Sequence, residues 1–225
     1  MDKALHFCQH FHRSEHADYS YTVPKDESIQ EWSPFVFVEP SCGDGRILQQ
    51  LVDGISSTFH TNRQRHCILA YDIDEHLIVQ CKERFTSSAE ISFSIQCNNF
   101  LELTGDKLKE EITRIRDTSD NFYLVFVGNP PYSSGCGSGS TISRDLPSQF
   151  MTHSIVNLRA AFVSFIVPKR CNNEVKKTQK VLEKETQATW NCDSHELENS
   201  LFSFQGDVVK QPSVLQCWHK STSSK

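Results

Sequence analysis

The 225-residue chain has no uninterrupted apolar run of about 18 to 20 residues, the length needed to cross a bilayer. Its first twelve residues carry charges and histidines where a secretory signal would carry an apolar stretch. These two absences argue against a membrane-spanning or secreted protein. We therefore expect an intracellular protein of the cytoplasm or nucleus that has no membrane partner.

An excess of positive charge is also missing. The sequence has 23 Lys and Arg against 28 Asp and Glu, which gives a net charge of −5. This balance gives the chain no global attraction for nucleic acid, so composition by itself counts against a polyanionic substrate.

Paired cysteine spacings are absent as well. The nine cysteines are an odd number and are scattered, and Cys42, Cys67 and Cys97 lie inside or beside apolar runs. Free thiols in a reducing compartment explain this pattern better than a disulfide framework. A dense group of possible metal ligands near the N-terminus matches no common zinc spacing, so no metal site is predicted. Its members are His6, Cys8, His10, His12 and His16.

What the chain does have is a regular alternation of short apolar runs with amphipathic segments. The runs are rich in β-branched and aromatic residues and predict buried strands at 35–38, 68–71, 91–95, 123–127 and 162–167. Between them apolar residues recur at helical spacing. This alternation predicts a parallel sheet with helices on both faces. A further strand is expected at 213–218, an exposed helix at 172–187, and a mobile Gly/Ser-rich loop at 133–143.

The first strand runs directly into the segment Glu39-Pro40-Ser41-Cys42-Gly43-Asp44-Gly45. Two glycines at a strand-to-helix turn let the backbone fold tightly and approach a ligand closely. The following helix N-terminus presents unpaired N–H groups to an anionic group such as a carboxylate. The spacing is not that of the dinucleotide-binding folds, so no pyrophosphate is implied. Taken alone, the segment fits a structural turn equally well.

The second strand ends in Tyr71-Asp72-Ile73-Asp74. An acid at the tip of this strand can bind the two hydroxyls of a ribose. Asp72 has the better position for this role, because Asp74 could equally cap a helix that begins near Glu75. Ile73 would then lie against an adenine face. For Asp72 alone an ordinary solvated acid is the alternative, but together with the glycine turn it predicts a ligand site.

The third strand is followed by Asn99 and Phe100. The amide could hydrogen-bond an adenine amino group, and the aromatic ring could pack on the base. A polar turn after a strand is the alternative explanation for this pair.

The fourth strand delivers Gly128-Asn129-Pro130-Pro131-Tyr132. The consecutive prolines fix the backbone and hold an amide, a carbonyl and an aromatic ring in a rigid relation. The side-chain oxygen of Asn129 and the carbonyl of Pro130 could each accept one N–H bond of an exocyclic amino group. The nitrogen lone pair, otherwise delocalised into the ring, would then point at a methyl donor. The ring of Tyr132 could stack on an extruded base.

At this point the chain resembles the Rossmann-like S-adenosylmethionine-dependent amino-methyltransferases, the group that holds adenine-N6 enzymes with an Asn-Pro-Pro-Tyr motif. The matching motifs are VFVEPSCGDGRIL, LAYDID, NNFLEL and VGNPPY, in the family's order. The resemblance covers residues 19–219, the predicted methyltransferase domain. Residues 1–18 are then an N-terminal extension that need not be ordered, and residues 220–225 a C-terminal tail.

The resemblance implies a seven-stranded, mostly parallel sheet with an antiparallel last strand, and S-adenosyl-L-methionine as cofactor. The residues expected to face the cofactor are Thr22, Glu39, Gly43, Gly45, Asp72, Ile73, Asn99 and Phe100. Those expected to act on the acceptor are Asn129, Pro130, Pro131 and Tyr132. Thr22 would help to hold the methionine carboxylate, and Asn99 stands where the family often has Asp.

The implied function is methyl transfer to an exocyclic amino nitrogen, N6 of adenine in RNA or DNA. The motifs leave no room for a separate target-recognition domain, which favours RNA, or a catalytic subunit guided by a protein partner. A protein glutamine N5-methyltransferase and a non-catalytic cofactor-binding scaffold are the alternatives. A group of basic residues could contact phosphates or form a solvated surface. They are Arg144, Lys169, Arg170, Lys176 and Lys177.

Overall fold

The computed structural model describes residues 35–58, 66–88, 90–116, 122–132, 146–197, 201–204 and 207–221. The expected N-terminal extension at 1–18, most of the expected tail at 220–225 and the expected loop at 133–143 lie outside these residues, as does Arg144.

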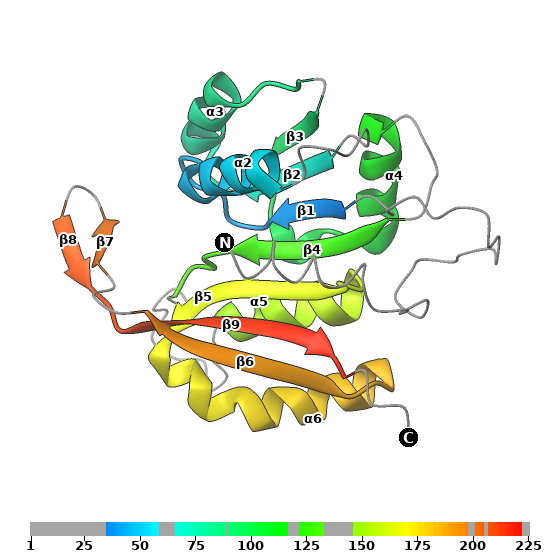
Figure 1. Cartoon of the computed structure of the whole chain (residues 1–225), viewed down its shortest axis with the longest axis vertical. Coiled ribbons are helices and arrows are strands. Elements are labelled where there is room, and N and C mark those ends of the chain that lie inside the picture. Colours follow the sequence, from blue (N-terminus) through cyan, green and yellow to red (C-terminus); the bar gives the residue numbers. More distant parts are fainter. Residues whose placement is uncertain are drawn as a thin grey trace.

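The centre of the molecule is a seven-stranded sheet with the order β3-β2-β1-β4-β5-β9-β6 (Figure 1). Strands β1 to β5 pair in parallel, and β9 lies antiparallel between β5 and β6. This confirms the predicted mostly parallel sheet with an antiparallel last strand. The strands are β1 Phe35–Glu39, β2 His66–Asp72, β3 Ile91–Cys97, β4 Tyr123–Gly128, β5 Phe162–Pro168, β6 Trp190–Leu197 and β9 Ser213–Lys220.

Helices cover both faces of the sheet because successive strand residues point to opposite sides. In β1, Phe35 and Phe37 belong to one apolar cluster, and Val36 and Val38 belong to another. The first cluster includes residues of α2 Arg46–Thr58 and α3 Glu75–Arg84, and the second includes residues of three further helices. These are α4 Gly105–Arg116, α5 Leu146–Thr152 and α6 Val175–Thr186.

Short helical turns complete the connections between strands and helices. The 3₁₀-helix η2 follows β3, the π-helix η3 extends α5, and the 3₁₀-helix η4 joins β5 to α6. Their bounds are η2 Phe100–Glu102, η3 His153–Asn157 and η4 Lys169–Glu174. The π-helix widens the end of α5, so that the Leu158 N–H donates to the His153 carbonyl at 3.0 Å before the chain enters β5.

Six of the strands contain the apolar runs that predicted them, whereas the seventh strand of the expected sheet, β6, was not located by any apolar run. Its residues WNCDSHEL are mostly polar. Strand β6 is the last in the sheet order and pairs with β9 alone, so it needs no apolar side chains on two buried faces. A hairpin of β7 Leu201–Phe204 and β8 Asp207–Lys210 follows it, and this was also missed. The hairpin projects from one edge of the sheet (Figure 1).

Seven cysteines lie in the described part of the chain and all are free thiols, five of them buried. This agrees with the expectation of buried free thiols at Cys42 and Cys67, whereas Cys97 is exposed. None of the described helices is both long enough and apolar enough to cross a membrane.

The order of the strands creates one reversal. From β1 the chain moves to β2 and β3 on one side, and then returns to place β4 and β5 on the other. The connections that leave β1 and β4 therefore diverge at their carboxyl ends. Ligands of open α/β sheets bind at such a position.

Buried His66, at the start of β2, should make the fold sensitive to acid. Burial lowers the pKa of its imidazole to about 4, while an unfolded chain titrates near 6.5. The unfolded state therefore binds the proton first, and stability should fall by up to about 3 kcal/mol as the pH drops from 6.5 to 4. Urea denaturation across this range should show a flatter pH dependence for His66→Leu. The same change at exposed His76 should keep the wild-type dependence, and equal curves for the two variants would contradict this role.

Candidate active site

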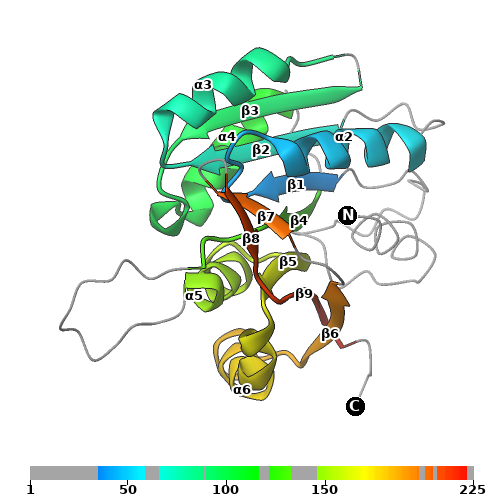
Figure 2. The same ribbon diagram turned by 90° about the vertical axis from the view of Figure 1, so that its left-hand side faces the viewer.

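Most of the predicted site residues gather at the carboxyl edge of the parallel strands. Glu39 and Asp72 are the last residues of β1 and β2, and Asn129 follows β4 directly. Figure 2 looks onto this edge, with the β7–β8 hairpin in front of it. Thr22, the remaining cofactor-binding prediction upstream of β1, lies outside the described residues.

The glycine turn between β1 and α2 uses its two glycines differently. Both have left-handed backbones, with φ of +52° at Gly43 and +82° at Gly45. A Cβ on Gly45 would lie 2.5 Å from Phe85 Cε2 and 2.7 Å from Cys81 Sγ, so Gly45 lets α3 pack against the turn. A Cβ on Gly43 would meet nothing within 4 Å. Only Gly43 therefore borders open space.

Asp72 organises this turn. Its Oδ2 accepts a hydrogen bond from the Gly43 N–H at 2.8 Å, and its Oδ1 accepts one from the Asp74 N–H at 3.0 Å. Each carboxylate oxygen can accept a second bond, so this arrangement leaves capacity for hydroxyl donors. The neighbouring Asp74 caps α3 by accepting from the N–H groups of His76 and Leu77. Helix capping was one of the roles considered for this residue.

Glu39 is a buried acid with an unsatisfied oxygen. The residue is 1% exposed, and its Oε2 has no hydrogen-bond partner. Burial, and then the nearby acidic groups of Cys81, Asp72 and Asp44, raise the pKa of Glu39 well above its ordinary value. A buried, unpaired carboxyl group is costly, and a cationic donor would satisfy it.

The tetrapeptide after β4 packs directly against the glycine turn. A Cβ on Gly128 would lie 3.1 Å from Pro40 Cδ, so glycine at 128 permits the close approach of the two loops. The Ser41 hydroxyl donates to the backbone carbonyl of Asn129 at 3.1 Å. The side-chain Oδ1 of Asn129 is buried and has no hydrogen-bond partner. The backbone of Asn129 is thus held in place while its side-chain oxygen remains available as an acceptor.

Tyr132 is anchored from the opposite side. Its hydroxyl lies 3.4 Å from Ser213 Oγ, and Ser213 donates to the Gln211 carbonyl at 3.0 Å, so Tyr132 is the donor to Ser213. The Arg170 guanidinium donates to the Tyr132 carbonyl at 3.1 Å. Burial raises the pKa of Tyr132. These anchors come from β9 and η4, and no local pattern in the sequence pointed to them. Within the tetrapeptide, Pro130 is buried and Pro131 is exposed.

The remaining predicted cofactor residues differ in their surroundings. Ile73 is 76% exposed beside Asp72. Asn99 is exposed, and its side chain accepts from the Leu101 N–H at 3.2 Å and donates to Glu102 at 2.8 Å. The side chain of Asn99 therefore caps η2, which is the polar-turn alternative considered for this position.

Phe100 does not have the exposed ring that stacking on a base requires. It is 1% exposed and lies in the core, where its ring centroid is 5.2 Å from that of Phe150 and 5.9 Å from that of Phe126. The expectation that Phe100 packs on an adenine is corrected here to a role in the core. Its position after a strand predicted an exposed turn, but η2 folds the ring back under α5.

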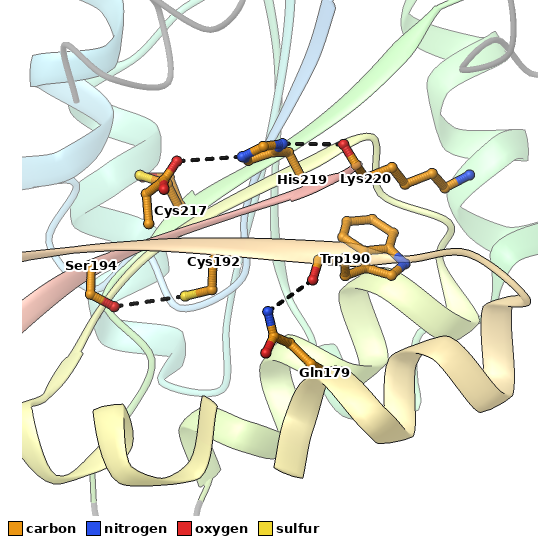
Figure 3. Close-up of polar contacts among 9 residues, drawn as sticks. Gln179, Trp190, Cys192, Ser194, Cys217, His219 and Lys220 are labelled. Atoms are coloured by element: carbon orange, nitrogen blue, oxygen red, sulfur yellow. Dashed lines mark hydrogen bonds and ion pairs between the residues drawn. The ribbon is translucent and has the colours of Figure 1, made fainter. Parts of the chain in front are cut away.

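A second group of polar residues lies on β6 and β9, away from the carboxyl edge that holds the predicted site residues (Figure 3). His219 Nε2 is 3.4 Å from Asp193 Oδ2, and Cys192 Sγ is 3.7 Å from Ser194 Oγ. Gln179 on α6 donates to the Trp190 carbonyl at 3.0 Å. In the described segments no three His, Cys, Asp or Glu side chains come together as a possible metal site. The contact of His219 with Asp193 joins β9 to the edge strand β6, and the bond from Gln179 joins α6 to β6.

Comparison with known proteins gives a fold and no closer relationship. No protein-family model and no curated protein sequence matches the chain. The solved structures it resembles include the 23S rRNA methyltransferase ErmE, at 13% identity and a TM-score of 0.52 over 84% of this chain and 62% of that one. Another is a Listeria monocytogenes protein described as a class I S-adenosylmethionine-dependent methyltransferase, at 15% identity and a TM-score of 0.54. That match covers 88% of this chain and 57% of the Listeria protein.

The N-terminal domain of human METTL16 in complex with SAH is a third similar structure, at 16% identity and a TM-score of 0.50. The match covers 96% of this chain and 68% of the METTL16 domain. The chain thus has the fold of S-adenosylmethionine-dependent methyltransferases, and it spans about 60% of the length of the first two proteins.

The two glycines of the turn should respond differently to the same substitution. Gly45→Ala combines a left-handed backbone with steric overlap against α3 and should lower the free energy of unfolding by about 2 kcal/mol or more. Gly43→Ala carries only the backbone penalty, about 1 kcal/mol. Urea denaturation of the two variants measures both effects. Equal destabilisation would show that α3 does not constrain the turn.

Proposed function

We propose that the protein is an S-adenosyl-L-methionine-dependent methyltransferase that methylates an exocyclic amino nitrogen, N6 of adenine in RNA or DNA. The observation that carries this proposal is the buried, unpartnered Oδ1 of Asn129. It is an acceptor held beside the glycine turn at the point where the strand order reverses.

The residues of the turn fit S-adenosyl-L-methionine in their chemistry. Its ammonium group would pair with the buried Glu39 carboxylate, whose Oε2 lacks a partner. Its ribose hydroxyls would donate to Asp72, and its methionine portion would approach the backbone at Gly43, where a Cβ would meet nothing within 4 Å. Thr22 remains a proposed contact for the carboxylate. The bound cofactor supplies an electrophilic methyl group.

On the acceptor side, the chain holds and orients the amino group. Asn129 Oδ1 and the Pro130 carbonyl would each accept one N–H bond, which directs the nitrogen lone pair away from the ring. The prolines at 130 and 131 fix these acceptors, so the geometry is prepared before the acceptor binds. The ring of Tyr132, tied by its hydroxyl to Ser213, would support the face of the base. No strong general base is required, because the nitrogen becomes acidic once methylated and releases its proton to water.

RNA is the favoured acceptor. One of the similar structures carries the printed name of a 23S rRNA methyltransferase. A protein partner that selects the target is compatible with this proposal. A glutamine amide presents a similar planar NH₂ group, so methylglutamine in a protein acceptor is the alternative product to be measured.

Binding of the cofactor should release a proton from Glu39. Burial favours the neutral acid in the free protein, and a cation beside it would favour the carboxylate. Affinity for S-adenosylhomocysteine, which keeps the ammonium group, should therefore increase with pH above the ordinary glutamate value of 4.5. Calorimetry in buffers of different ionisation enthalpy counts the released protons. Glu39→Gln should abolish this release, and an unchanged count would remove Glu39 from the cofactor site.

Asn129→Ala should abolish methyl transfer while it leaves affinity for S-adenosylhomocysteine nearly intact. Loss of one aligned acceptor should lower the rate about 10²-fold or more, by analogy with oxyanion-hole donors. Labelled methyl transfer into fractionated RNA, DNA and protein, with mass spectrometry of the product, measures both rate and target.

Exposed Asn98, which follows β3, provides the matched control, and Asn98→Ala should keep full activity. Tyr132→Ala should be impaired, whereas Tyr132→Phe should keep much of the activity because stacking needs the ring. Full activity of a folded Asn129→Ala protein would refute the mechanism for nucleic-acid and protein acceptors alike.

A further inference from the structure

The positive charge of this acidic chain is concentrated in η4 and α6. Residues 169–186 contain six Lys and Arg and three Glu, a local charge of +3, whereas the whole chain carries −5. The remainder of the chain therefore carries −8. The six cations are Lys169, Arg170, Lys176, Lys177, Lys180 and Lys184.

This basic segment begins at the acceptor side of the candidate site. Strand β5 ends at Pro168, on the same edge as the tetrapeptide, and η4 follows without a gap. The Arg170 guanidinium donates to the Tyr132 carbonyl at 3.1 Å, so the first cations lie beside the tetrapeptide. From there α6 runs along the sheet away from that edge (Figure 1).

The lysines of α6 lie on its exposed side. Its inner side is fixed by buried Leu182 and by the bond from Trp190 Nε1 to Thr186 at 3.0 Å. The hydrogen bond from Gln179 to the Trp190 carbonyl holds the same side (Figure 3). Lys176, Lys180 and the other lysines of the helix are exposed.

Few of these cations are neutralised strongly. Lys177 pairs with Glu174 at 3.3 Å, Lys184 with Glu185 at 3.8 Å, and Lys169 with Glu196 at 2.7 Å. These are surface pairs, each worth about 0 to 1 kcal/mol, so phosphates can replace the carboxylates. Within the described segments, no carboxylate forms an ion pair with Lys176 or Lys180.

We propose that the exposed face of η4 and α6 binds the phosphate backbone of the nucleic-acid acceptor. Lys176 and Lys180 are one helical turn apart, a rise of about 6 Å, so cations repeat along the helix as phosphates repeat along a strand. Such contacts position the strand and leave base recognition to the tetrapeptide. The proposal rests on the proposed function and explains how a chain of net charge −5 can bind a polyanion.

The test compares two double charge reversals with the same net charge. Lys176→Glu/Lys180→Glu changes the proposed surface, and Lys82→Glu/Lys109→Glu changes exposed lysines on α3 and α4. Fluorescence anisotropy with a labelled 20-nucleotide single-stranded RNA, titrated over a range of KCl, measures affinity. The first variant should bind at least 10-fold more weakly, and its slope of log affinity against log salt should fall by about 1.4, the value for two lost phosphate contacts.

The control variant should bind RNA like the wild-type protein, and both should bind S-adenosylhomocysteine with unchanged affinity. Equal losses in the two variants would reduce the effect to net charge and overturn the surface, as would no loss in either. Tighter binding of a poly-glutamate peptide than of RNA, lost in the first variant, would overturn it in favour of an acidic protein partner.

Methyl transfer is scored separately. If the Lys176→Glu/Lys180→Glu variant alone loses RNA binding, and the wild-type protein methylates no acceptor, the proposed surface is supported and the proposed function is overturned.

Discussion

The close approach of two loops, one after β1 and one after β4, is the constraint on which the site depends. The strand order sends the chain in opposite directions after these loops, and glycine at 128 lets the loops pack closely, because a Cβ at this position would lie only 3.1 Å from Pro40 Cδ. The bond from Ser41 to the Asn129 carbonyl then joins the loops. A larger residue at 128 would push apart the segment that carries Gly43 and the segment that carries Asn129. The glycine turn and the tetrapeptide are therefore one structural unit.

Two unsatisfied acceptors lie within this unit. Glu39 Oε2 and Asn129 Oδ1 are both buried without a hydrogen-bond partner, although such atoms ordinarily cost about 1 to 3 kcal/mol each. Asp72 shows the opposite arrangement, since the N–H groups of Gly43 and Asp74 already engage both of its oxygens. One acid thus shapes the turn, while the other acid and the amide remain available. Departures from full satisfaction of this kind are expected where a ligand completes the structure.

Acidic and basic residues are also separated between the two sides of this unit. At the glycine turn, Asp72 and Asp44 lie close enough to Glu39 to raise its pKa. The basic residues follow β5 on the acceptor side of the tetrapeptide. Acidic residues therefore end β1 and β2 on one side of the β1–β4 junction, and basic residues follow β5 on the other.

The sequence by itself determined the strands with apolar runs, the mostly parallel sheet, the glycine turn and the rigid tetrapeptide, because periodicity and the φ restrictions of Gly and Pro act locally. The tertiary structure decided the rest. Polar β6 is a strand because β9 pairs with it, and Phe100 is a core residue because η2 folds it under α5. The anchors of Tyr132 lie 38 and 81 residues away along the chain. Contacts across such separations leave no periodic pattern, since only the folded sheet brings their partners together.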